Sequence, residues 1–496
     1  MLAAAAIAAL VAAIPLVYLV VRASEAGGEG ILAALWRERN AVLALNSLGL
    51  ALAVAAGCLL LGIPTAWAIT RLRMPLPGLW RVLAALPLAI PSYVTAFAWV
   101  ATWPGVRGFW PLLAVMVLAC TPYVTLAVAA ALRLADPGVE DVARTLGKSP
   151  LSVFLTVTLP QIAPAAAAGA LLAALYTLSD FGAVSVLRFQ TLTWAIHSAY
   201  QGTLDRVLAA VMAVLLVLLA VLVVSGERLL RTRANRRRAA IRTRQPVLID
   251  HRSTRVAATV GLFAVAALSL GLPIFALIRR LIEGTSVGLD VGRLAESTGS
   301  TLLLSLAGAG LAVGLALPIA VLAARYRSRL VTGLETVTYV GHVVPGIVVG
   351  LSLVFFSLAV VPELYQTVIV LAFAYAVLFL PRAIGSARAA IVQVSPALEE
   401  VARSLGRSAI RTWVTVTART AWPGIAAGAL LVMVTAMKEL PATLMLRPIG
   451  TNTLATELWE KTTNAAYGAA APYAIALVLL ASVPAYLLSR PRGAGW

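Results

Sequence analysis

Long apolar runs recur along the whole chain, and many reach about 18 residues, which is enough to cross a bilayer as an α-helix. Lipid offers no partners for backbone polar groups, so only helices and closed barrels cross it. Hydrophobic residues make up 61% of the 496 residues and charged residues 12%. That leaves too few polar side chains to cover a soluble protein of this size. The sequence therefore predicts an all-α integral membrane protein.

About twelve membrane-spanning helices are expected. They fall at roughly residues 2–21, 41–69, 81–103, 111–132, 161–182, 206–226, 256–278, 301–324, 335–359, 365–387, 421–443 and 469–489. The first run lacks the basic start and the cleavage site of a signal peptide, so it is taken as a helix.

Basic residues are concentrated in alternate loops. One side of the predicted membrane holds 27 of the 39 Lys and Arg residues but only 8 of the 20 acids. The basic loops hold Arg71, Arg73 and Arg81; Arg133, Arg144 and Lys148; residues 227–255; Arg325, Arg327 and Arg329; Arg382 through Arg419; and Arg490 with Arg492. The positive-inside rule places this side, with both chain termini, in the cytosol. The net charge of +19 is thus a topology signal, and no nucleic-acid partner is expected.

A stretch rich in arginine, residues 227–255, interrupts the hydrophobic rhythm near the middle of the chain. Such a run is typical of a solvated cytosolic connector attracted to anionic lipid headgroups. It divides the chain into two predicted modules, residues 1–226 and 256–496, each with six helices.

The two modules are copies of one another. Residues 140–172 and 399–431 align without gaps and share 17 of 33 residues, at a shift of 259. Upstream, a shift of 254 pairs Pro64 with Pro318, Arg71 with Arg325, Arg73 with Arg327, and Pro91 with Pro345. Six helices per copy means that both copies insert the same way up, related by a pseudo-two-fold axis along the membrane normal.

The repeated segment is polar and lies between the fourth and fifth helices of each module. Residues 140–146 predict a short helix with Val142 and Leu146 on one face and an i,i+4 pair, Glu140 with Arg144, on another. Gly147 is expected to end this helix in the left-handed conformation. Ser149 and Pro150 suit the start of a second helix. The second copy repeats the pattern, with Ala409 in place of the proline. The result is a helix–Gly–helix elbow whose apolar ridge suggests a docked partner.

The pattern Glu-x-Ala-Arg-x-Leu-Gly, followed by Leu159-Pro160, resembles the EAA loop of binding-protein-dependent ABC importer permeases. The resemblance implies two tandem six-helix type I (MetI-like) permease modules. It also implies that the elbows couple to ATPase subunits. The coupling residues would be Glu140, Ala143, Arg144, Leu146 and Gly147, with Glu399, Ala402, Arg403, Leu405 and Gly406 in the second copy. There, Ala418-Arg419 replaces Leu-Pro, which leaves the end of the second loop open.

Fused permeases of this length with two such loops are most similar to the ferric-iron family, with thiamine and phosphonate relatives as neighbours. The strings IPSYVTAFAW (90–99), SDFGAVSVLRFQTLTWAI (179–196) and MKELPATLMLRPIGTNTLATELWE (437–460) carry this resemblance. It implies a bacterial inner (plasma) membrane location, two cytosolic ABC ATPase subunits that use ATP and magnesium, and a periplasmic solute-binding protein. The chain itself is expected to bind no cofactor and to catalyse no reaction.

Asp180 and Glu439 occupy equivalent positions at the predicted outer end of the fifth helix of each module. They offer hard oxygen ligands to a passing ferric ion or repel anions. Alternatively, they are helix-end polar residues that are wetted by the periplasm or contact the binding protein. Lys438, beside Glu439, would neutralise its charge. The scattered histidines predict no metal site.

Pro91 and Pro345 lie in the middle of the third span of each module, where a proline bends a helix. The bend serves either as a hinge that lines a substrate pathway or as a static kink. Tyr93 and Tyr123 are candidate polar groups of that pathway in the first copy only.

Two other classes of protein compete with a permease. A membrane enzyme would need a catalytic motif such as HExxH, which the sequence lacks; the ATP-binding GxxxxGK[ST] motif is also absent. A secondary transporter or channel is the stronger rival, but its mechanism does not call for a cytosolic elbow in each half.

Overall fold

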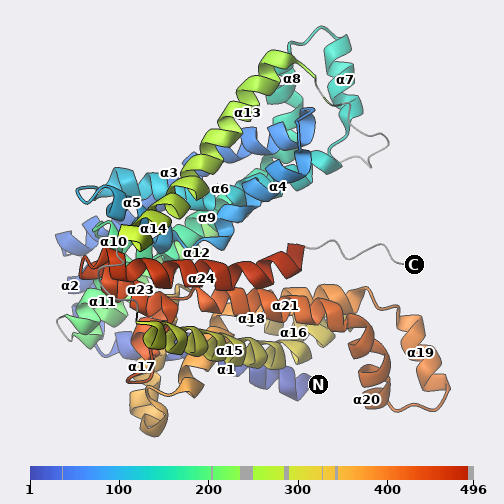
Figure 1. Cartoon of the computed structure of the whole chain (residues 1–496). Helices are drawn as coiled ribbons and strands as arrows, with labels where there is room; N and C mark the ends of the chain where they lie inside the picture. Colours follow the sequence, from blue (N-terminus) through green and yellow to red (C-terminus); the bar gives the residue numbers. More distant parts are fainter. Residues whose placement is uncertain are drawn as a thin grey trace. The chain divides into compact units, whose positions relative to one another are not determined.

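The computed structural model describes residues 1–35, 37–202, 205–234, 248, 250–283, 290–326, 328–340 and 344–489. In these ranges the regular secondary structure is entirely helical (Figure 1). The all-α prediction is confirmed.

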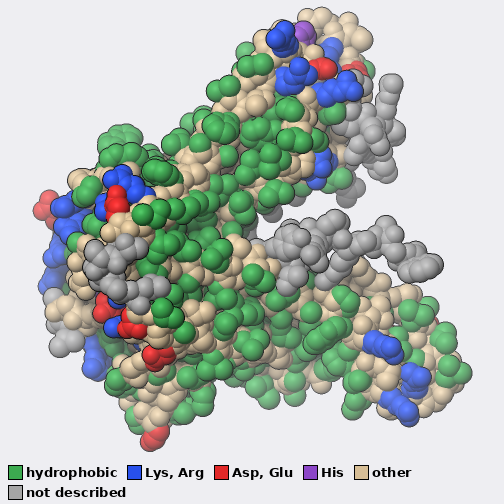
Figure 2. All heavy atoms as spheres, viewed as in Figure 1, with side chains coloured by type: hydrophobic (Ala, Val, Ile, Leu, Met, Phe, Trp, Pro, Cys, Tyr) green, Lys and Arg blue, Asp and Glu red, His purple; other side chains and the backbone are tan. Residues whose placement is uncertain are grey.

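Ten of the described helices are long and apolar enough to cross a membrane. They are α1 (Leu2–Ser24), α3 (Glu38–Arg71), α6 (Phe109–Leu134), the continuous Pro150–Ser179 helix (α8, η2 and α9), Arg206–Ser225 within α12 (Arg206–Ala234), Arg252–Glu283 (α13, η3 and α14), α15 (Val291–Arg325), α18 (Val368–Val392), Ala409–Met437 (α20, η6 and α21), and Tyr467–Pro484 within α24 (Tyr467–Ser489). Hydrophobic side chains cover their sides in Figure 2.

The third predicted span of each module is broken rather than continuous. In the first copy, α4 (Pro77–Ala85) and η1 (Leu86–Ala89) meet α5 (Ser92–Thr102) at an angle of 89°. In the second copy, α16 (Arg329–Val340) is followed by α17 (Gly346–Val360), an apolar helix shorter than a full membrane span. The expectation of a bent but continuous helix at 81–103 was wrong. Pro91 has no N–H to donate, and it holds the preceding Ile90 in an extended conformation.

The described chain forms two compact units. Unit 1 comprises residues 1–35, 196–214 and 284–496, and unit 2 comprises residues 36–195 and 215–283. In unit 2, α3, α6 and α9 (Leu159–Ser179) pack against one another, and α13 and α14 pack beside them and α5. In unit 1, the equivalent α15, α18 and α21 (Arg419–Met437) form the central group, and α1 packs against α15, α16 and α17.

Each unit therefore takes the first helix of the opposite half of the sequence. The modules 1–226 and 256–496 describe the sequence repeat, and their boundaries stay a prediction. The expected connector, residues 227–255, overlaps the end of α12 and the start of α13; residues 235–247 and 249 lie outside the described residues.

Candidate coupling site

The first elbow joins two short helices at a glycine. Helix α7 (Pro137–Thr145) begins earlier than predicted, because the Asp136 side chain accepts a hydrogen bond from the Gly138 N–H at 2.9 Å and Pro137 takes the first helical position. Gly147 follows with φ of +79°, which confirms the left-handed helix end. The Ser149 side chain then caps α8 (Pro150–Val153) by accepting from the Ser152 N–H.

The second elbow has the same local structure. Helix α19 (Pro396–Ser404) ends before Gly406, whose φ is +83°. The Ser408 side chain caps α20 (Ala409–Thr412) by accepting from the Arg411 N–H, so the absent proline is not needed. The change from Leu-Pro to Ala418-Arg419 also leaves the loop end intact. A wide π-turn follows in both copies, η2 (Phe154–Thr158) and η6 (Trp413–Ala418), and each continues into the long helix.

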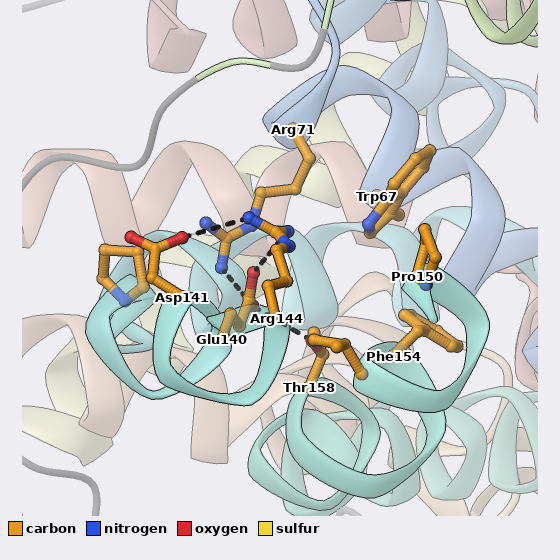
Figure 3. Close-up of a pocket in the computed structure, with 10 residues that line it drawn as sticks. Trp67, Arg71, Glu140, Asp141, Arg144, Pro150, Phe154 and Thr158 are labelled. Atoms are coloured by element: carbon orange, nitrogen blue, oxygen red, sulfur yellow. Dashed lines mark hydrogen bonds and ion pairs between the residues drawn. The ribbon is translucent and has the colours of Figure 1, made fainter. Parts of the chain in front are cut away.

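A buried ion pair fastens the first elbow to the C-terminal end of α3 (Figure 3). The Arg71 guanidinium lies 3.0 Å from Oε1 of Glu140, which is only 6% exposed. The Thr158 hydroxyl donates to the same oxygen at 3.0 Å. The expected pair with Arg144 is also present, at 3.6 Å between its Nη2 and Glu140 Oε2. Glu140 thus links α7, η2 and α3.

The second elbow repeats this anchor with equivalent residues. The Arg325 guanidinium, on α15, lies 2.5 Å from Oε1 of Glu399, and the Thr417 hydroxyl donates to that oxygen at 2.7 Å. The glutamate of each elbow therefore binds an arginine and a threonine of the same chain. Ala143 and Ala402 are buried as well. The resemblance placed all four residues in ATPase coupling; the structure places them on the inner face of their elbows.

The space behind the two elbows is filled differently. In the first copy, a cavity of about 70 Å³ lies among α3, α7 and η2, with Trp67 and Phe154 in its wall (Figure 3). The residues equivalent to these two are Val321 and Trp413, which pack with an apolar cluster that includes Ile391. The second anchor therefore lies beside an apolar cluster.

Four apolar side chains project from each elbow into solvent. Val142 is 58% exposed and Leu146 76%, and their equivalents Val401 and Leu405 are 57% and 76% exposed. The full ridge consists of Val139, Val142, Leu146 and Leu151 in the first elbow, and Leu398, Val401, Leu405 and Ile410 in the second. Every member has its counterpart at a shift of 259. Lys and Arg side chains accompany the ridges, as Figure 2 shows at both elbows.

The acidic group exposed on each elbow is one residue beyond the anchoring glutamate. Asp141 and Glu400 are exposed, and so are Arg144 and Arg403. Asp141 pairs with Arg144 at 3.1 Å on the outer face of α7. A partner that meets the elbow therefore meets Asp141 or Glu400 together with the apolar ridge.

Asp180 directly follows α9 and is buried at the start of the next helix. One of its oxygens accepts from the Ala183 N–H at 2.8 Å, inside α10 (Gly182–Val186), and the other accepts from the Ser92 hydroxyl at the start of α5. The Tyr176 hydroxyl donates to Ser92 Oγ at 3.2 Å. This carboxylate joins three helices of unit 2.

Glu439 is the equivalent residue in unit 1. Its oxygens accept from the Ala442 and Thr443 N–H groups, both at 3.0 Å, and from the Thr443 hydroxyl at 2.9 Å, at the start of α22 (Pro441–Leu446). A methyl group at Gly346, the counterpart of Ser92, would collide with this carboxylate. Both acids therefore cap a short helix against the segment that follows the mid-span proline.

The remaining predicted pathway residues lie around these breaks. Pro91 and Pro345 directly precede α5 and α17 with nearly the same backbone angles. Tyr93 is buried against Gly182. Tyr123 is half-buried, with its ring 6.0 Å from that of Tyr176. A contact of any of these side chains with substrate stays a prediction. No group of three or more His, Cys, Asp or Glu side chains suited to a metal ion occurs among the described residues.

Sequence reasoning missed the partners of the two elbow glutamates. They are Arg71 and Thr158 for Glu140, and Arg325 and Thr417 for Glu399. The signal was present, because both pairs recur in the two copies at ends of apolar helices that border basic loops. What the sequence did not provide was their proximity, since Arg71 and Glu140 are separated by 69 residues.

The duplicated elbows on a duplicated helical bundle define a class of membrane permease. The family of binding-protein-dependent transport system inner membrane components matches residues 58–236 and 316–489, once in each half, and the chain belongs to this family. The Fe(3+)-transport system permease protein FbpB 2 of Haemophilus influenzae is 36% identical over 481 residues, covering 96% of this chain and 95% of the relative. These findings confirm the resemblance on which the sequence interpretation rested.

Shorter similarities reach permeases of other transport systems. The molybdenum transport permease ModB of Mycobacterium tuberculosis is 31% identical over 189 residues, covering 34% of this chain and 71% of the relative. The sulfate transport permease CysT of Escherichia coli is 29% identical over 139 residues, covering 25% of this chain and 50% of the relative.

Proposed function

We propose that this chain forms both membrane halves of an ATP-driven importer and docks one ABC ATPase subunit on each elbow. The observation that carries the proposal is the pair of matched apolar ridges. Exposed Leu146 and Leu405 would remain in water without a partner, which is unfavourable for clustered apolar side chains. The two ridges share their residue spacing and exposure, so they suit two subunits of the same kind.

The two Arg–Glu anchors, buried in the first copy and partly buried in the second, supply a mechanical link. A partner that moves an elbow also moves the helix to which that elbow is tied, α3 through Arg71 or α15 through Arg325. Closure of two ATPase subunits on ATP would draw the elbows together and switch the pathway between outward and inward openings. ATP and magnesium would be bound by those subunits, and this chain would catalyse no reaction.

The cargo that we propose is ferric iron, delivered by a periplasmic solute-binding protein. The support is the iron-transport relative, which matches nearly the whole chain, whereas the molybdenum and sulfate relatives match a third of it or less. In this arrangement both termini and both elbows lie in the cytosol, and the chain resides in a bacterial inner membrane.

Reconstitution into proteoliposomes with an ABC ATPase and a periplasmic solute-binding protein from the same organism tests this function. We expect uptake of ⁵⁵Fe(III) that requires ATP, and no uptake of thiamine or 2-aminoethylphosphonate. Uptake of one of the organic solutes instead would reject iron while keeping the importer class. Iron uptake driven by an ion gradient without ATP would make the chain a secondary transporter.

A further inference from the structure

The loop between α22 and α23 (Leu454–Thr463) is longer than its counterpart in the first half of the chain. Five residues separate Arg447 from Thr453, whereas two separate the equivalent residues Arg188 and Thr191. The second half therefore carries an insertion of three residues. The loop borders the start of α15, on the side that the basic-loop pattern predicts to be periplasmic.

The two loops are held at their ends in the same way, which supports this alignment. The Leu454 N–H donates to the Thr301 hydroxyl at 2.9 Å, and the Leu192 N–H donates to the Ser47 hydroxyl at the same distance. Thr301 and Ser47 are equivalent at the shift of 254. The insertion therefore lies before these fixed points, within residues 448–452.

The inserted loop, residues 448–452, is a tight turn with an exposed apolar tip. The Thr451 N–H donates to the Pro448 carbonyl at 3.0 Å, and Gly450 takes the positive φ, +80°, that a type II turn needs at its third residue. Ile449, at the tip, is 87% exposed, the largest exposed fraction among the large hydrophobic residues that the structure describes. An isoleucine held outward by a fixed turn can bind a partner with little loss of conformational entropy.

A buried carboxylate anchors the base of this loop. Glu457, on α23, is 1% exposed, and its Oε1 accepts from Asn452 Nδ2 and from Arg293 Nε, both at 2.7 Å. The side-chain oxygen of Asn452 in turn accepts from the Arg447 guanidinium. The first half has Ala195 at the position of Glu457, so it lacks this anchor. The loop of the second half is therefore preorganised by a network that its counterpart does not have.

A notch of about 360 Å³ opens between the loop and the N-terminal end of α15. Its lining residues are Asp290, Arg293, Glu296, Ser297, Gly450 and Asn452. The lining carries two exposed carboxylates, Asp290 and Glu296, against one guanidinium, Arg293, which is already paired with Glu457. The notch therefore suits a basic side chain.

We propose that one lobe of the periplasmic solute-binding protein docks on this surface, with a basic side chain in the notch and an apolar contact over Ile449. An apolar anchor ringed by polar groups is the usual composition of a protein–protein interface. The inference rests on the proposed function, from which it takes the partner. Because the first half lacks the insertion and its anchor, a binding protein with two unlike lobes fits the duplicated permease in one orientation.

Binding of the solute-binding protein from the same organism to the permease–ATPase complex in nanodiscs tests the surface. We expect Glu296→Arg to weaken binding about tenfold, mostly through slower association, and Ile449→Ser to weaken it about as much. Replacing residues 448–452 with the Phe-Gln of the first half should reduce binding to background. Glu296 is the better target of the two acids, because Asp290 also caps α15 by accepting from the Arg293 N–H.

Glu363→Arg is the matched control. Glu363 is an exposed acid in η5 (Pro362–Leu364), in another predicted outer loop of the second half. This variant should bind as the unmodified complex does. Equal binding by Glu296→Arg, by the loop replacement and by the unmodified complex would overturn the docking surface, while ATP-driven uptake would still uphold the importer function. No binding to the unmodified complex would overturn both.

Photo-cross-linking from the loop tip tests the single orientation. With p-benzoyl-phenylalanine at position 449, the cross-linked peptides of the binding protein should all come from one lobe. Equal cross-linking to both lobes would overturn the orientation. Cross-linking to a second copy of the permease would replace the binding protein as the occupant and overturn the proposal.

Discussion

Arg71 and Glu140 form a buried ion pair, 3.0 Å long, between the C-terminal end of one membrane helix and an elbow that follows 69 residues later. Arg325 and Glu399 repeat the pair in the second copy. The glutamate that sequence resemblance assigns to an external partner is thus engaged inside its own half of the protein. Each elbow is tied to a membrane helix, α3 or α15, by its ion pair, and a mechanical coupling element requires such a tie.

Removing the charge of Glu140 should loosen the first elbow. Glu140→Gln leaves the buried Arg71 without its counter-ion, at a cost of roughly 3–5 kcal/mol. We expect faster amide exchange across residues 137–147 by mass spectrometry and a lower unfolding temperature. The adjacent, exposed Asp141→Asn should change stability by less than about 0.5 kcal/mol. Equal effects of the two substitutions would contradict the anchor.

Charging the two ridges should prevent docking without unfolding the chain. Leu146→Asp together with Leu405→Asp changes two side chains that are each 76% exposed, so the fold loses little packing. We expect the variant to insert into the membrane normally but to lose co-purification with the ATPase. Leu146→Met with Leu405→Met keeps the apolar character and should retain the complex. Retention of the complex by the Asp pair would remove the ridges from the interface.

Rigidifying the elbow glycines should disrupt the same interface by altering backbone shape. Proline fixes φ near −65°, whereas Gly147 and Gly406 adopt +79° and +83° and donate hydrogen bonds to the ends of α7 and α19. Gly147→Pro with Gly406→Pro should abolish co-purification while leaving membrane insertion intact. Gly310→Ala, at an open position of α15, is the control and should behave as the unmodified chain. Normal co-purification of the double proline variant would count against the docking role.

Stability should fall in mild acid because of His197. This residue lies on α11 (Leu192–Gln201), with its ring 5.7 Å from that of Trp459 on α23 (Leu454–Thr463), and burial lowers its pKa to about 4. Between pH 6.5 and 4 the unfolded chain takes up a proton that the folded chain does not. The free energy of unfolding therefore decreases as pH falls, by about 2 kcal/mol at pH 5.

Thermal unfolding in detergent at pH 7.5 and pH 5 measures this effect. His197→Gln should reduce the difference between the two pH values, and His251→Gln, at an exposed position before α13, should leave it unchanged. The same acid sensitivity in all three proteins would exclude His197 as its source.

Local signals in the sequence were enough to predict the elbows. The glycine at 147 and the serine at 149 act on neighbouring backbone, so their conformations follow from residue type alone. The repeat then transferred the same prediction to residues 399–409, despite the loss of a proline. The all-α membrane class and the repeated architecture could likewise be predicted from the sequence, because the length of apolar runs and the charge of loops are properties of the sequence itself.

Contacts between residues that are far apart in the sequence could not be predicted from it. The partner of Glu140 comes from another helix, and the nearest arginine in sequence, Arg144, was the natural but incomplete choice. The break at Pro91 was expected only as a bend, since its extent depends on the helices packed around it. Arg382 counts with a basic loop by charge pattern, although it lies within α18, because a charge pattern alone does not mark where a helix ends.

Cysteine cross-linking from both elbows to the ATPase tests the central claim most directly. Leu146→Cys and Leu405→Cys place thiols on the two ridges, while the native Cys58 and Cys120 are buried. Each single variant should cross-link to one ATPase subunit from the cytosolic side, and the double variant should yield one permease joined to two. Cross-linking at only one elbow, or reaction of the two cysteines from opposite sides of the membrane, would contradict the account.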